Sequence, residues 1–141
     1  MLSIGPREHF KWRSISSSSF GRIGVPIARI FLKKSTGVWQ EFWVMIDSGA
    51  VITLLNKDDC DLLGYQLTSG TPYKIKGIGG NEIQTYVHSI DMKVGDEPIK
   101  VRVAFSDSPK HALVLGRLDV FDKFEIDLRG KTLDSYLARD L

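Results

Sequence analysis

The feature that most constrains the fold is a series of short apolar runs that alternate with polar residues and are separated by turns. The stretch "RIGVPIARIFL" begins at Arg22, and a turn at residues 33–37 leads into "VWQEFWVMI". Later runs, "EIQTYVHSIDMKV" and "EPIKVRVAF", alternate in the same way. Runs of this length with a period of two form half-buried strands. The sequence therefore predicts a mostly-β fold that is closed or sandwiched.

Two short helices are expected among these strands. Asn56 has the side chain of an N-cap, acidic residues follow in the first turn, and Gly64 ends the segment. Cys60 lies inside this helix and is interpreted as a small packing residue. The amphipathic stretch "RLDVFDKF", which begins at Arg117, is expected to be the second helix.

The length of 141 residues fits one domain with a real core. Residues 1–20 end in a run of four serines and are expected to be a flexible lead-in, with a processing site or a dimer-stabilising arm as alternatives. Residues 21–129 are predicted to form the domain. Residues 130–141 are predicted to add a C-terminal hairpin strand and a tail.

Composition excludes several classes of function. The net charge of +2 and the lack of a basic run interleaved with aromatic residues argue against nucleic-acid binding. No apolar run approaches the ~20 residues of a membrane span, and the first residues lack a secretory apolar stretch. The single cysteine and three scattered histidines offer neither a disulfide nor a metal-ligand set. We expect a cytoplasmic protein without metal or cofactor.

The stretch "VMIDSGAVI" places one carboxylate, Asp47, between two apolar runs. A buried charge is costly unless it is paired, hydrogen-bonded or neutralised. Asp-Ser-Gly is also good turn chemistry, so a capped turn is the simple alternative.

Two further motifs follow in order. Gly77-Ile78-Gly79-Gly80 forms the tip of a predicted hairpin, and Leu113-Val114-Leu115-Gly116 ends an apolar strand before Arg117. Together with the Asp47 motif they resemble the retropepsin-like aspartic proteases, over residues 22–128. The resemblance implies a closed, pepsin-type β-barrel lobe with one or two short helices. Because the chain has one such aspartate motif, it also implies a homodimer in which a twofold axis supplies the second Asp47.

The resemblance assigns roles to individual residues. Asp47 and its symmetry mate would activate a water and protonate the substrate carbonyl, and the Ser48 hydroxyl would brace the two loops. Gly49 and Ala50 would support the loop close to the substrate. The residues of the expected flap are Gly77, Ile78, Gly79 and Gly80. Ile52, Val114 and Leu115 are expected to line an apolar pocket, with Gly116 and Arg117 structural.

Two positions depart from the retroviral pattern. Val51 stands where relatives often carry an acidic partner for the arginine, and Leu118 separates Arg117 from Asp119. The pairing of Arg117 is therefore left open.

The expected activity is cleavage of extended peptides or proteins by an aspartic endopeptidase. The main alternative is a catalytically silent lobe that binds peptides or dimerises. A weaker one is a self-processing protease cut in its serine-rich lead-in.

Overall fold

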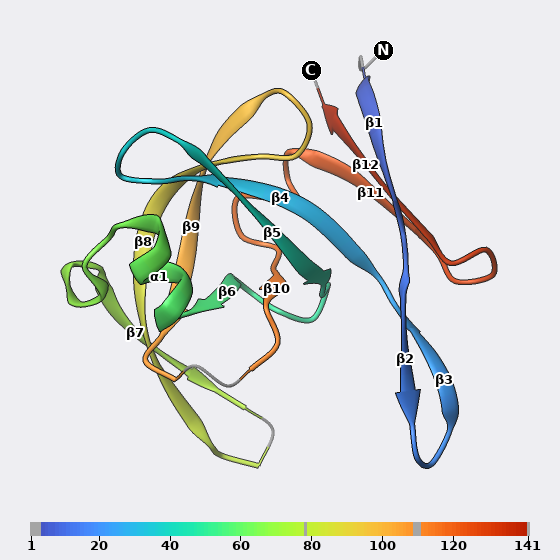
Figure 1. Cartoon of the computed structure of the whole chain (residues 1–141), viewed down its shortest axis with the longest axis horizontal. Helices are drawn as coiled ribbons and strands as arrows, with labels where there is room; N and C mark the ends of the chain where they lie inside the picture. Colours follow the sequence, from blue (N-terminus) through green and yellow to red (C-terminus); the bar gives the residue numbers. More distant parts are fainter. Residues whose placement is uncertain (1–3, 78, 109–110, 141) are drawn as a thin grey trace.

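The computed structural model describes residues 4–77, 79–108 and 111–140, and most of these residues lie in strands (Figure 1). In the described part of the chain, no helix is long and apolar enough to cross a membrane.

The main sheet has seven strands in the order β4-β5-β10-β6-β9-β8-β7. Its strands are β4 (Ile27–Lys33), β5 (Trp39–Ile46), β6 (Thr53–Asn56), β7 (Thr71–Lys76), β8 (Glu82–Lys93), β9 (Pro98–Ser106) and β10 (Val114–Leu115). A further pairing of β4 with β8, through Phe31 and Lys93, closes the sheet into a ring. This agrees with the expected closed, mostly-β lobe.

The core fills the ring because the strands alternate inward and outward side chains. In β4, for example, Ala28, Ile30 and Leu32 are completely buried. β9 begins with the same alternation and becomes buried on both faces from Val103 onward. The apolar periodicity of the sequence therefore predicted strands here, and the structure shows which side of each strand packs inward.

The first expected helix is confirmed as α1 (Lys57–Leu63). The Asn56 side chain accepts a hydrogen bond from the Asp59 N–H, the Asp59 carboxylate accepts one from the Asn56 N–H, and Gly64 ends the helix in the left-handed conformation. Cys60 is completely buried, and burial raises the pKa of its thiol to about 11, as suits a packing residue. A short 3₁₀ helix, η1 (Leu67–Ser69), follows.

The prediction of a second helix, beginning at Arg117, is wrong. Arg117 lies in a bend and residues 118–123 form turns, because Asp119 has a φ of 67° and breaks the helical path.

The terminal strands form a separate three-stranded sheet in the order β1-β12-β11. Its strands are β1 (Ile4–Lys11), β11 (Phe124–Arg129) and β12 (Asp134–Asp140). The β11–β12 hairpin confirms the expected C-terminal return strand. A third unit pairs β2 (Arg13–Ser17) with β3 (Gly21–Val25), and we call this pair the ribbon.

The expectation of an irregular lead-in is therefore wrong for residues 4–17, which form β1 and β2. β1 pairs with β12, a partner 125 residues away at His9 and Asp134, whose side chains lie 2.6 Å apart. Local composition does not reveal a partner at that distance. The domain boundaries themselves stay a prediction.

Candidate active site

Asp47 directly follows β5, in the loop that connects β5 to β6. These two strands are not neighbours, because β10 lies between them. β10 runs parallel to β5 and antiparallel to β6. The loop of residues 47–52 therefore crosses the end of β10, and the chain that leaves β10 passes beneath it.

Backbone hydrogen bonds join the loop to this passing chain at both ends. The Asp47 N–H donates to the Leu115 carbonyl at 3.1 Å. At the other end, the Arg117 N–H donates to the Ala50 carbonyl at 3.0 Å and the Leu118 N–H to the Val51 carbonyl at 2.8 Å. The position of Asp47 is thus fixed by a segment almost 70 residues later in the sequence.

Gly116 makes the close crossing possible. A Cβ on this residue would collide with the carbonyl group of Ile52 and would lie 2.7 Å from the Thr53 nitrogen. The Gly116 N–H donates to the buried Thr53 hydroxyl at 3.1 Å, so this buried donor is satisfied. The glycine predicted to be structural therefore has a clear steric reason.

The Asp47 side chain is half-buried rather than stranded in the core. Its Oδ1 accepts a hydrogen bond from the Gly49 N–H at 2.9 Å, and its carbonyl accepts one from the Ala50 N–H at 3.1 Å. Ser48 and Gly49 are exposed beside it. The loop is thus a tight turn that also presents a carboxylate at the surface.

Arg117, whose pairing the sequence left open, donates from Nη1 to the Ser48 carbonyl at 3.2 Å. It therefore braces the Asp47 loop from the chain that passes beneath it. A backbone carbonyl supplies the acceptor in place of an acidic side chain at position 51.

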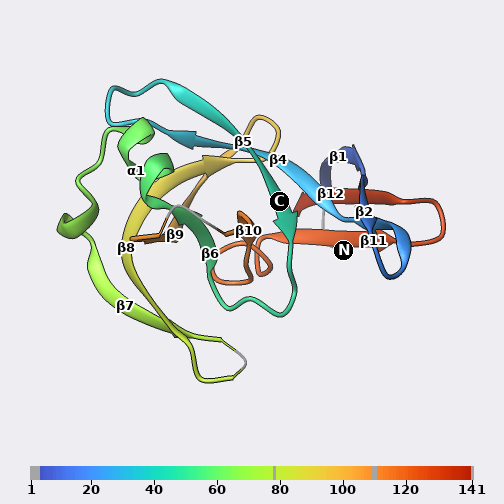
Figure 2. The ribbon, with the colours of Figure 1, turned by 60° about the horizontal axis from the view of Figure 1, so that its bottom comes forward.

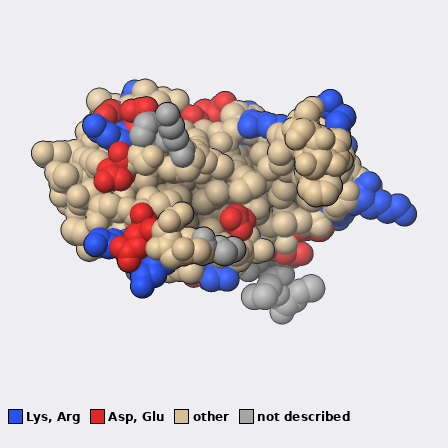
Figure 3. All heavy atoms as spheres, turned by 90° about the horizontal axis from the view of Figure 1, so that it is seen from below, with Lys and Arg blue, Asp and Glu red and all other residues tan. Residues whose placement is uncertain are grey.

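A groove lies beside this loop. One hollow of about 430 Å³ separates Val51 and Ile52 from Thr71–Tyr73 of β7 and Val87 of β8. A second hollow of about 580 Å³ shares Val51 and Leu118 with the first and extends to Phe121. Seen from below, this side of the molecule is mostly uncharged, with acidic and basic groups scattered rather than gathered (Figure 3). The first hollow thus has mainly apolar walls, whereas the second also contains the charged side chains of Arg102, Arg117, Asp119 and Asp122.

A model of the aspartyl protease family matches residues 35–118, which is more than half of the chain. The chain belongs to this family.

A retropepsin-like aspartic protease from Rickettsia conorii, known from a crystal structure, is 16% identical, with a TM-score of 0.61 over 99% of this chain and 95% of that one. This likeness shows the retropepsin-like fold. The EIAV protease in complex with an inhibitor is 21% identical, with a TM-score of 0.49 over 73% of this chain and 88% of that one. No curated protein sequence matched.

The structure separates the predicted pocket residues of this aspartyl protease family member. Ile52 lines the groove. Leu115 is completely buried among core side chains, so it supports the loop from below and does not form part of the groove surface. Val114 pairs with Met45 and Leu54 and is not among the residues that line the groove.

The β7–β8 hairpin closes one side of the groove, and its tip contains three described glycines of the glycine motif. The Gly77 N–H donates to the Asn81 carbonyl at 2.8 Å, and Gly79 and Gly80 have φ values of 94° and 87°, which suit glycine. Ile78 lies outside the described residues. Figures 1 and 2 both show the loop between β5 and β6 lying between this hairpin and the ribbon.

Sequence reasoning missed the ion pair of Arg102 and Asp119, which also borders the groove. The Arg102 guanidinium donates to both carboxylate oxygens of Asp119, at 2.9 and 3.0 Å, and its backbone N–H donates to the same group. These hydrogen bonds hold the pKa of the Asp119 carboxyl below its usual value. Arg102 lies in β9 and Asp119 in the turns that follow β10, so no motif in the sequence connects them.

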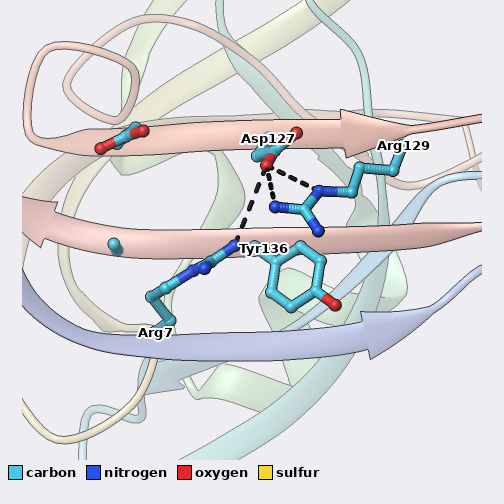
Figure 4. A pocket seen from close by; sticks show the side chains of 6 residues that line it. Arg7, Asp127, Arg129 and Tyr136 are labelled. Carbon is cyan, nitrogen blue, oxygen red and sulfur yellow. Dashed lines mark hydrogen bonds and ion pairs between the residues drawn. The ribbon is translucent and has the colours of Figure 1, made fainter.

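A hollow of about 200 Å³ also lies on the three-stranded sheet (Figure 4). There the guanidinium groups of Arg7 and Arg129 lie 4.2 and 4.6 Å from the centre of the Tyr136 ring. Asp127 bonds Arg129 at 2.9 Å and lies 3.8 Å from Arg7. These contacts bind the three strands together, and the opposite charges balance within the hollow.

Among the described residues, no group of three His, Cys, Asp or Glu side chains is placed to hold a metal ion.

Proposed function

We propose that the protein is an aspartic endopeptidase that acts as a homodimer on extended peptides. The observation that carries the proposal is the placement of Asp47. Its half-buried carboxylate sits on a loop held at both ends by hydrogen bonds, beside a groove whose first hollow has mainly apolar walls.

The chemistry needs two carboxylates, because one must accept a proton from water while the other donates a proton to the substrate carbonyl. Two carboxylates within hydrogen-bonding distance share a single proton; the aspartic proteases are the standard example. This chain contains one such loop, so a second copy supplies the other Asp47 across a twofold axis.

The groove supports a peptide substrate with apolar side chains. Val51, Ile52 and Leu118 face Tyr73 and Val87 across it. The β7–β8 hairpin serves as the flap: its exposed glycines allow the tip to open for a peptide and then close over it. Unpaired backbone groups at such a hairpin can add to an extended substrate strand.

The test is the substitution Asp47→Asn, assayed on a library of fluorogenic peptides with apolar residues at the cut site. Loss of one acid–base partner from each subunit should lower kcat/KM by about 10²–10⁴-fold. The half-buried side chain should leave the unfolding temperature nearly unchanged. Equal cleavage by wild type and Asp47→Asn would overturn the proposal and favour the catalytically silent lobe.

The pH profile gives a second test. Activity requires the shared proton, so it should peak on the acidic side and fall as pH rises and the pair loses that proton. A rate that still increases above neutral pH would contradict the mechanism.

A further inference from the structure

The ribbon has an apolar face that the rest of the described chain does not cover. Ile15 and Ile23 stand directly opposite each other in the register, with Val25 on the same side. Ile15 is 45% exposed, Ile23 is 39% exposed, and Phe20 at the turn is 82% exposed. Apolar side chains gathered in this way usually mark an interaction surface.

The other face of the ribbon is polar and rests on its own chain near the base. Ser14, Ser16 and Arg22 lie on that side, with Arg22 Nε donating to the Ser14 hydroxyl at 3.1 Å. A Cβ on Gly24, which shares this side, would lie 3.0 Å from both Trp12 and Leu133. The ribbon therefore uses its polar side for the intramolecular contact and leaves its apolar side free.

A two-stranded ribbon is marginal in water unless its apolar face is covered. This ribbon pairs with no other strand of the described chain. Something other than its own sheet pairing must therefore stabilise it.

The register places the base of the ribbon beside the catalytic loop. Ile27 pairs with Met45, and the Pro26 carbonyl accepts a hydrogen bond from the Ile46 N–H at 2.9 Å. If this register is continued by one pair beyond Pro26 and Ile46, Val25 is level with Asp47. From there the other four residue pairs of the ribbon extend about 13 Å further, away from the ring, as Figure 1 shows.

We propose that the ribbon is an arm that packs its apolar face against a second copy of this chain. This inference rests on the proposed function, which requires the partner's Asp47 within hydrogen-bonding distance of the first. An arm that starts level with Asp47 and extends well beyond it then lies along the partner's surface. The apolar face formed by Ile15, Phe20 and Ile23 becomes buried in the dimer, and the arm helps to bring the two catalytic loops together.

The experiment removes the exposed apolar side chains of the ribbon and leaves every residue of the seven-stranded ring unchanged. Ile15→Ser, Phe20→Ser and Ile23→Ser are combined in one chain, and the control chain combines Val38→Ser and Leu62→Ser, which are at least as exposed as Ile15 and Ile23. Val38 lies in the turn between β4 and β5 and Leu62 in α1, on the opposite side of the molecule from the ribbon (Figure 1). Sedimentation equilibrium measures the dimer dissociation constant, and peptide cleavage is followed over the same range of protein concentration.

We expect the ribbon variant to raise the dimer dissociation constant by about tenfold or more, because apolar anchors carry most of the affinity of an interface. Its cleavage activity should recover at high protein concentration with an unchanged kcat, and the control chain should match wild type. An unchanged dissociation constant would overturn the proposal. If the ribbon variant has an unchanged dissociation constant but a raised KM, the ribbon contacts the substrate instead.

The dissociation constant is also measured in chains that carry Asp47→Asn, so that it does not depend on activity. If the dimer needs the ribbon but the chain with Asp47 intact cleaves no peptide, the proposed function alone is contradicted. A wild-type chain that stays monomeric at every concentration would overturn both proposals.

Discussion

The loop that carries Asp47 and the ribbon meet at Pro26, yet they are stabilised in opposite ways. The loop is bonded at both ends to the chain that leaves β10, through Leu115 and Arg117. Within the described residues, the ribbon pairs only with itself and exposes its apolar side. The difference indicates that one subunit fixes the position of Asp47 by itself, whereas the proposed dimer would depend on surfaces that a single subunit leaves uncovered. Four predictions test this contrast, from the largest effect to the smallest.

The largest effect is expected from Gly116→Ala. The new methyl group would press on the Ile52 carbonyl at the crossing of two backbones, where neither segment can move aside. We expect the free energy of unfolding to fall by about 3 kcal/mol, measured by urea denaturation. Gly130→Ala is the control, because its Cβ would meet only the Trp12 ring at 3.8 Å. Equal effects of the two substitutions would show that the crossing is not tight.

Thr53→Val should have the next largest effect on stability, because it leaves the buried Gly116 N–H without an acceptor. The expected loss is about 1–3 kcal/mol of unfolding free energy, again by urea denaturation. Thr85→Val is the matched control: this threonine is equally buried, but its hydroxyl donates to the carbonyl of Tyr73. A carbonyl that loses one donor is tolerated better than an N–H that loses its acceptor. A larger loss at Thr85 than at Thr53 would contradict the assigned role of the Thr53 hydroxyl.

Asp119→Asn tests the ion pair that ties the groove wall to β9. The pKa of the Asp119 carboxyl is lowered in the folded state by Arg102, so its contribution is present above the unfolded value of 3.8 and is lost as pH falls through the folded pKa. At pH 7 the free energy of unfolding of wild type should exceed that of the variant by about 0.5–1 kcal/mol. This difference should vanish in strong acid. Asparagine tolerates the positive φ at this position, so backbone strain is not added. Thermal unfolding of both proteins at several pH values checks this prediction. A stability difference that grows as the pH falls would contradict it.

The smallest effect is expected from Phe20→Ser in the monomer. Because this side chain is almost fully exposed, the unfolding free energy at low protein concentration should change by less than about 0.5 kcal/mol. Ile52→Ser, which removes a buried side chain next to the Asp47 loop, should cost about 2 kcal/mol or more. A large loss at Phe20 would mean that the ribbon is already packed within one subunit.

The sequence by itself determined much of this fold, because the deciding information is local. The alternation of apolar residues predicted the strands of the ring, and Asn56 with Gly64 marked both ends of α1, where the side chains and backbone concerned are only a few residues apart. The order of the three motifs was enough to predict the protease family. The failed helix after Arg117 shows the limit of local periodicity: the pattern is amphipathic, but Asp119 is drawn into a left-handed turn by its bonds to Arg102 on β9.

The tertiary structure alone decided which residues surround Asp47. It brought Leu115 and Arg117 beneath the loop, buried Leu115 where a pocket wall was expected, and set Tyr73 and Arg102 along the groove. It also turned a serine-rich segment into one strand of a ribbon, and the N-terminal strand into a partner of the C-terminal one. The physical reason is common to all of these: each depends on hydrogen bonds or packing between segments far apart in the chain, and such contacts leave no periodic trace in the local sequence.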